Sequence, residues 1–107
     1  MSFDAKLQIE EGVATIRLSG ELDAGSAQTF NNLVSDAAKH EPNRLVLLAA
    51  DLSYMSSAGL RCLVFAQQKL PRETEIVLVG AQPDVAETIR LTGFDRSITM
   101  EEAGDLR

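Results

Sequence analysis

Residues 45–70, LVLLAADLSYMSSAGLRCLVFAQQKL, decide the fold class of this chain. Residues 45–50 form an unbroken apolar run, which is typical of a strand that is covered on both faces. Residues 57–70 are apolar enough for a helix, and Pro71 ends it. Residues 51–56, between them, are expected to form a loop that gives way to the helix at the serine pair Ser56 and Ser57. A buried strand followed by a helix predicts an α/β fold whose central strands are parallel.

The rest of the chain continues this alternation of strands and helices. Leu7 and Ile9 alternate with polar residues, and Ala14, Ile16 and Leu18 recur at every second position. Both patterns predict half-buried strands, joined by a hairpin at Gly12. A second unbroken apolar run at residues 76–79 predicts another strand. Residues 97–100 are expected to form a last short strand, followed by an acidic end that we expect to be mobile.

Two further helices are predicted, one before residues 45–70 in the sequence and one after them. Apolar residues repeat at helical spacing up to about His40, and Asp23 is expected to cap the start of this helix. Pro83 suits the first turn of the other helix, and Gly93 suits the residue after its end. The resulting order is ββαβαβα, with a final short strand, which predicts a mixed sheet.

The composition limits the class of protein. The chain has 107 residues, of which 45% are hydrophobic, so we expect a single domain spanning residues 1–107 without linkers or repeats. Its net charge of −6 argues against nucleic-acid binding, because an acidic surface repels phosphate backbones. No apolar run is long enough for membrane insertion, and the first residues do not resemble a signal peptide. With its single cysteine the chain forms no internal disulfide, so we expect a cytoplasmic protein.

The adjacent serines lie where the predicted helix begins. One hydroxyl can accept a hydrogen bond from a free N–H group of the first turn, a cap worth about 1 kcal/mol. Either Ser56 or Ser57 can do this, and one serine is enough. The other hydroxyl is then free at the positive end of the helix dipole, where a phosphate would be stabilised. The pair is therefore consistent with capping alone or with a phosphorylation switch.

The predicted helix after the serine pair has two faces on a helical wheel. Arg61 and Gln68 lie within about 40° of Ser57, at about 100° per residue, and form a polar strip with it. Val64 and Phe65 flank this strip, so they are candidates for contact with a partner; the alternative is that a neighbouring loop covers them. The opposite side is the expected core face: Gly59, Cys62, Leu63, Ala66 and Leu70.

An enzyme is not expected, and the sequence predicts no catalytic residue, metal site or cofactor. A serine hydrolase needs a base beside its nucleophile, but the only histidine, His40, lies at the end of a different predicted helix. The nucleophile elbow, the phosphate-binding loop and the dinucleotide fingerprint are absent. One histidine and one cysteine make no metal cluster. Cys62 lies on the core face, which favours a buried structural thiol over a redox sensor.

Three segments resemble one known family. They are LSGELDAGSAQTF at residues 18–30, DLSYMSSAGLR at residues 51–61 and VGAQPDVAETIRLTGFDR at residues 79–96. They are similar, in this order and spacing, to segments of STAS domains, the family of anti-sigma factor antagonists. The resemblance implies the STAS fold, an α/β arrangement in which helices pack against a mixed sheet of about four to five strands.

The resemblance also implies a phosphorylation site. In the family, the phosphorylated serine follows an acidic residue or a serine at the end of the loop. Ser56 occupies the first position here, so Ser57 aligns with the phosphoacceptor, and Ser56 is the second choice. Ala58 stands where the family often has serine or threonine, and Gly59 matches.

In this family the unmodified domain binds an anti-sigma factor that is also an ATP-dependent serine kinase, and a sigma factor is released. Phosphorylation ends the complex, and a PP2C-type phosphatase restores it. ATP and magnesium would belong to the kinase. The alternative is a STAS scaffold or transporter-associated subunit in another signalling or transport complex; a transporter subunit would not need Ser57. The residues expected to bind the partner are Glu21, Asp23, Asp51, Ser53, Ser56, Ser57, Ala58, Gly59, Arg61, Val64, Phe65 and Gln68.

Overall fold

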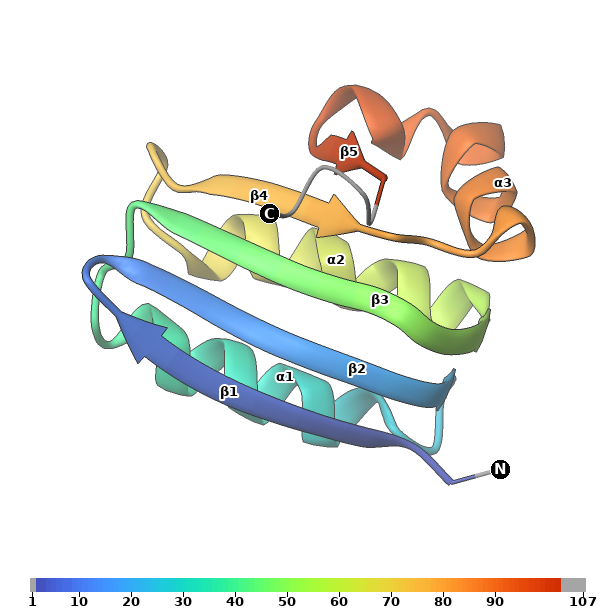
Figure 1. Cartoon of the computed structure of the whole chain (residues 1–107), viewed down its shortest axis with the longest axis horizontal. Helices are drawn as coiled ribbons and strands as arrows, with labels where there is room; N and C mark the ends of the chain where they lie inside the picture. The colour runs from blue at the N-terminus through green and yellow to red at the C-terminus, as the bar shows by residue number, and fades with distance from the viewer. Residues whose placement is uncertain (1, 103–107) are drawn as a thin grey trace.

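The computed structural model describes residues 2–102, and the acidic end beyond Glu102 lies outside the described residues. The expected order of elements is confirmed (Figure 1). The final strand is three residues long, and a short 3₁₀ turn, η1, precedes it. The elements are β1 (Asp4–Glu10), β2 (Val13–Leu22), α1 (Ala27–Ala38), β3 (Arg44–Met55), α2 (Ser57–Lys69), β4 (Glu75–Val79), α3 (Pro83–Thr92), η1 (Phe94–Arg96) and β5 (Thr99–Glu101).

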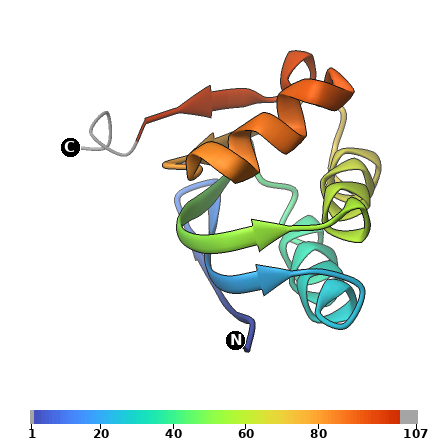
Figure 2. The same ribbon diagram turned by 90° about the vertical axis from the view of Figure 1, so that its right-hand side faces the viewer.

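The strands form one five-stranded sheet in the order β1-β2-β3-β4-β5. β1 pairs with β2 in the antiparallel sense, and the other neighbours are parallel, so the predicted mixed sheet is confirmed. α1 and α2 lie side by side on one face of the sheet (Figure 2). α3 lies beyond the carboxyl end of β4 (Figure 1). Because β2, β3, β4 and β5 are parallel, their carboxyl ends lie at the same edge of the sheet.

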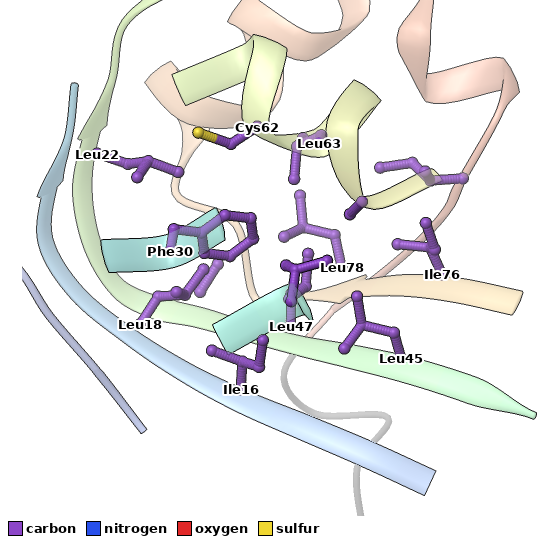
Figure 3. Packing of buried hydrophobic residues seen from close by; sticks show 14 of the residues in the cluster. Ile16, Leu18, Leu22, Phe30, Leu45, Leu47, Cys62, Leu63, Ile76 and Leu78 are labelled. Carbon is purple, nitrogen blue, oxygen red and sulfur yellow. The ribbon is translucent and has the colours of Figure 1, made fainter. Parts of the chain in front are cut away.

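The core lies between the sheet and the two helices on its face (Figure 3). Ile16 and Leu18 from β2, Leu47 from β3, Leu78 from β4 and Phe30 from α1 are all fully buried. Burying one such side chain stabilises the fold by roughly 1.5–3 kcal/mol. The alternating burial along β2 matches the period of two that the sequence predicts.

The prediction that both faces of β3 are covered was wrong. Leu45, Leu47 and Ala49 are buried, but Val46 and Leu48, which alternate with them, are only half-buried. The reason is that α1 and α2 cover the same face, which leaves the opposite face of β3 partly open. β4 differs, because all residues from Ile76 to Val79 are buried.

The prediction that residues 51–56 form a loop was also wrong, because β3 continues to Met55. Its last residues pair with the end of β2 up to Leu22↔Met55, through register shifts between Arg17 and Ser19 and between Gly20 and Glu21. Such irregularities bend a strand and change which side chains face outward. The segment before the serines is therefore held by the sheet.

Candidate functional site

Two segments far apart in the sequence meet at the carboxyl ends of β2 and β3. Glu21 lies opposite Tyr54 and Leu22 lies opposite Met55 in the parallel ladder. Just beyond the ladder, the backbone N–H of Ser56 donates to the carbonyl of Leu22 at 3.0 Å. The β2–α1 loop and the start of α2 are thus neighbours at one edge of the sheet (Figure 1).

The two serines have different roles at the start of α2. Ser56 is the N-cap residue: its backbone is extended, and its Oγ accepts a hydrogen bond from the N–H of Gly59 at 3.3 Å. Ser57 is the first residue of the helix, and it is exposed. Within residues 2–102, its hydroxyl has no hydrogen-bond partner, and Ala58 behind it is half-buried. Capping therefore leaves the Ser57 hydroxyl free.

Gly59 allows α2 to begin close against the sheet. A Cβ atom at this position would lie 2.5 Å from the carbonyl oxygen of Leu22 and 2.9 Å from Cγ of Met55. Real Cβ atoms do not approach other heavy atoms so closely. The absence of a side chain at Gly59 thus fixes the position of the helix start relative to both strand ends.

The β2–α1 loop is held by Ser26, which sequence reasoning missed. Ser26 is 8% exposed; its Oγ accepts from the N–H of Asp23 at 2.9 Å and donates to the carbonyl of Glu21 at 2.9 Å. The prediction that Asp23 caps α1 was wrong, because the N-cap residue is Ser26 and it makes no side-chain cap. The Asp23 carboxylate instead accepts from the N–H of Gly25 at 3.0 Å. The sequence signal for Ser26 was only its position directly before the helix.

The end of β3 presents polar groups and one aromatic ring. Asp51 and Ser53 are exposed, and the Ser53 hydroxyl donates to the carbonyl of Gly20 at 3.1 Å. Tyr54 is 50% exposed, although it is a large side chain between the buried residues Leu52 and Met55. Sequence reasoning did not single out Tyr54, because its exposure depends on the irregular pairing of β3 with β2.

The two faces predicted for α2 are confirmed for the core side, where Gly59, Cys62, Leu63, Ala66 and Leu70 are buried. Arg61 and Gln68 are exposed. Gln68 lies eleven residues after Ser57, which is about 16 Å along a helix, so it lies far from the first turn of α2.

Val64 and Phe65 are half-buried, and Phe65 packs against the core cluster. The domain itself thus covers part of Phe65, and its contact with a partner stays a prediction. The site that the structure brings together is the edge formed by the β2–α1 loop, the end of β3 and the first turn of α2. We call it the serine edge: Glu21, Asp23, Asp51, Ser53, Tyr54, Ser56, Ser57, Ala58 and Arg61.

Cys62 is a buried structural thiol, as predicted. Burial raises the pKa of the Cys62 thiol, and the neighbouring Arg61 guanidinium lowers it by a smaller amount. Its Sγ lies 3.4 Å from the carbonyl oxygen of Ala58, one turn earlier in α2. The thiol therefore stays protonated at neutral pH and supports the packing of α2.

The chemistry available at the serine edge is that of surface recognition. Glu21 and Asp23 are half-buried and Asp51 is exposed, while Arg61 supplies a positive charge. Among residues 2–102, no group of three or more His, Cys, Asp or Glu side chains could hold a metal ion. A hollow of about 530 Å³, lined by residues such as Lys6, Arg17 and Leu48, lies over β1–β3, and no residue of the serine edge lines it. In the part of the chain that the structure describes, no helix is long and apolar enough to cross a bilayer.

Removing the cap should cost more stability than removing the free hydroxyl. Ser56→Ala is expected to lower the free energy of unfolding by about 1 kcal/mol, because the N–H of Gly59 loses its acceptor. Ser57→Ala is the matched control and should change it by less than about 0.5 kcal/mol, as is usual for exposed positions. Urea denaturation of both variants measures the difference. Equal losses would mean that the cap is not specific to Ser56.

Comparisons with known proteins identify the family of this fold. The family model of the STAS domain matches residues 4–105. The anti-sigma-F factor antagonist RsfB of Mycobacterium tuberculosis is 22% identical over 89 residues, which cover 83% of this chain and 73% of RsfB.

Among solved structures, an anti-sigma factor antagonist from Mycobacterium paratuberculosis superposes with a TM-score of 0.85 at 26% identity, covering 94% of this chain and 86% of that one. The anti-sigma factor antagonist SpoIIAA in its unphosphorylated form superposes with a TM-score of 0.79 at 21% identity, covering 94% and 88%. The phosphorylated form of SpoIIAA, from Bacillus, gives 0.73 at 20% identity, covering 94% and 91%. By its matched residues and its fold, this chain belongs to the STAS domain family.

Proposed function

We propose that this chain is a cytoplasmic anti-sigma factor antagonist that phosphorylation of Ser57 switches off. The observation that carries the proposal is the division of roles between the serines: Ser56 caps α2, which leaves Ser57 exposed at the first helical position. In its unmodified form the chain binds an anti-sigma factor with serine kinase activity, which frees a sigma factor for transcription. A PP2C-type phosphatase reverses the modification. Relatives and structural neighbours named as anti-sigma factor antagonists support this assignment.

A phosphate on Ser57 is compatible with the fold. Among the described residues, the N–H groups of Ser57 and Ala58 have no acceptor, and they lie at the positive end of the helix dipole. A phosphate oxygen at this position can accept hydrogen bonds from them. Because Ser57 is exposed, the modification displaces no core side chain. The switch therefore acts on the surface and leaves the domain folded.

The same phosphate prevents docking. It adds about −1.5 to −2 charges where a neutral hydroxyl would contact the partner. Glu21, Asp23 and Asp51 outnumber Arg61 at the serine edge, so the phosphate would add negative charge to a surface that is already acidic. Its desolvation in an interface would cost several kcal/mol unless the partner supplied matching cations. A partner that binds the hydroxyl form therefore does not bind the phosphorylated form.

Tyr54 is expected to anchor the partner at this edge. Exposed aromatic side chains at the centre of interfaces often contribute more than about 2 kcal/mol to binding. Tyr54→Ala should weaken binding of the anti-sigma factor by at least about tenfold, or about 1.4 kcal/mol, without changing the melting temperature. Leu91→Ala is the matched control, because Leu91 is also large and exposed but lies at the end of α3. Titration calorimetry with the purified partner measures the affinity of both variants. If Tyr54→Ala bound the partner as tightly as Leu91→Ala, Tyr54 would not belong to the interface.

The proposal is tested by capturing the partner on the immobilised chain and purifying it. The expected partner phosphorylates Ser57 with ATP and then releases the chain. A partner without kinase activity would support the alternative, a STAS scaffold or transporter-associated subunit, and would contradict the proposed switch.

A further inference from the structure

β1 forms one edge of the sheet and has a neighbour on one side only. It is seven residues long and pairs with β2, whereas the other edge strand, β5, has three residues. The open side of β1 runs along the lower border of the sheet in Figure 1. A long edge strand exposes N–H and C=O groups that can pair with another strand. Natural proteins usually shorten, cover or bend such an edge, but β1 carries no register shift in its pairing with β2.

We infer that β1 pairs with β1 of a second copy of this chain, in the antiparallel sense, about a two-fold axis through Gln8. In this arrangement Lys6 lies opposite Glu10 of the second copy, and Glu10 lies opposite its Lys6. Leu7 lies opposite Ile9 on the other face. A two-fold interface requires a surface that is complementary to itself, and residues 6–10 of β1 meet this requirement.

The backbone restricts the possible registers. Alternate residues of an edge strand turn their N–H and C=O groups outward, so the two-fold axis must pass through a residue and not between two residues. An axis through Leu7 would place Asp4 opposite Glu10 twice, and an axis through Lys6 would oppose two lysines. Like charges directly opposite each other are destabilising. An axis through Ile9 would pair only residues 8–10. The axis through Gln8 is the register without a charge conflict or a shortened ladder.

In the pairing of β1 with β2, neither Lys6 nor Glu10 stands opposite a residue of opposite charge. Lys6 lies directly opposite Arg17 of β2, and Glu10 lies opposite Val13. Within residues 2–102, neither Lys6 nor Glu10 takes part in an ion pair. The second copy would place a carboxylate beside each Lys6 and thereby offset its repulsion with Arg17. Cross-strand pairs of opposite charge contribute roughly 0.2–1 kcal/mol each.

The apolar face of β1 also supports this pairing. Ala5, Leu7 and Ile9 are half-buried and pack against the core cluster below α1. Facing Leu7 with Ile9 of the second copy would extend the core across the junction, with α1 of both copies on the same face. Residues 6–10 lie beside residues 13–17 of β2, away from Glu21 and the serine edge. The dimer therefore leaves the serine edge of each copy open and does not depend on the proposed function.

Charge reversal tests the inference. By sedimentation velocity, the unmodified chain should show a concentration-dependent dimer below about 1 mM. Lys6→Glu and Glu10→Lys should each raise the dimer dissociation constant at least about tenfold, because each opposes like charges twice. The double variant, Lys6→Glu with Glu10→Lys, should restore it to within about threefold. Arg72→Glu, in the exposed turn before β4, is the control and should change nothing. Circular dichroism verifies that every variant is folded.

Cysteine cross-linking tests the register. Cys62 is buried, so an added surface thiol is the reactive one. Gln8→Cys should form a disulfide-linked dimer on mild oxidation, because residue 8 faces itself across the axis. Lys6→Cys should not, because its two copies would be about 14 Å apart at about 3.4 Å per residue. A monomer at all concentrations would overturn the inference, as would a double variant that dissociates as readily as the single ones.

Discussion

Ser57→Asp should weaken binding of the anti-sigma partner by at least about 100-fold, or about 2.7 kcal/mol, while the melting temperature stays within a few degrees. The carboxylate places a charge where the partner contacts a hydroxyl, and its desolvation costs several kcal/mol. Within the free domain the same charge is tolerated, because Ser57 is exposed and an acidic residue in the first turn stabilises a helix by about 0.3–1 kcal/mol. Titration calorimetry and thermal denaturation measure the two effects.

Two controls separate charge from position. Ser57→Ala should keep the affinity within about threefold, because small exposed side chains contribute little to binding, and it should abolish phosphorylation. Ser97→Asp adds the same charge at another exposed serine, after η1, and should leave binding unchanged. If Ser57→Asp instead lowered the melting temperature strongly, the Ser57 side chain would be needed for the stability of the fold. Equal effects of both Asp variants would mean that net charge alone weakens binding.

Gly59→Ala should destabilise the fold by about 1–3 kcal/mol, which lowers the melting temperature of a domain of this size by roughly 4 °C or more. Helix propensity alone predicts the opposite sign, because alanine favours a helix over glycine by about 1 kcal/mol. The added Cβ would lie 2.5 Å from the carbonyl of Leu22, which is backbone and cannot rotate away. The helix start would have to shift, and Ser57 with it, so partner binding should fall too.

Gly25→Ala is the matched control for this substitution. A Cβ at Gly25 would lie 3.4 Å from Oδ1 of Asp23, an ordinary contact, and its backbone needs no left-handed conformation. Its melting temperature should change by less than about 2 °C, since compatible surface substitutions stay within about 0.5 kcal/mol. If Gly59→Ala raised the melting temperature, α2 would not be packed against the strand ends as described.

The order of elements could be predicted because it depends on local patterns. The apolar run at residues 45–50, the helical spacing after Ser57 and the prolines that bound the helices are all visible in the sequence. The course of residues 51–55 was not predictable in this way. Their burial alternates irregularly, because β3 pairs with β2 through register shifts that involve residues about thirty positions earlier. A pattern of period two cannot reveal such long-range pairing.

The candidate site was predictable to a similar extent. The sequence placed two serines at a helix start and left open which one caps it; the hydrogen bond to Gly59 resolves this in favour of Ser56. Asp23 and Ser26 are both good capping residues, and contacts inside the loop decide between them. Tyr54 was missed because its exposure follows from the irregular end of β3.

Phosphosite mapping tests the central claim most directly. The purified partner is incubated with ATP and the unmodified chain, and the product is digested and analysed by mass spectrometry. We predict a single phosphate on Ser57, its absence from the Ser57→Ala variant, and unchanged labelling of the Ser97→Asp variant. A phosphate on Ser56, or no phosphate on Ser57, would contradict the account.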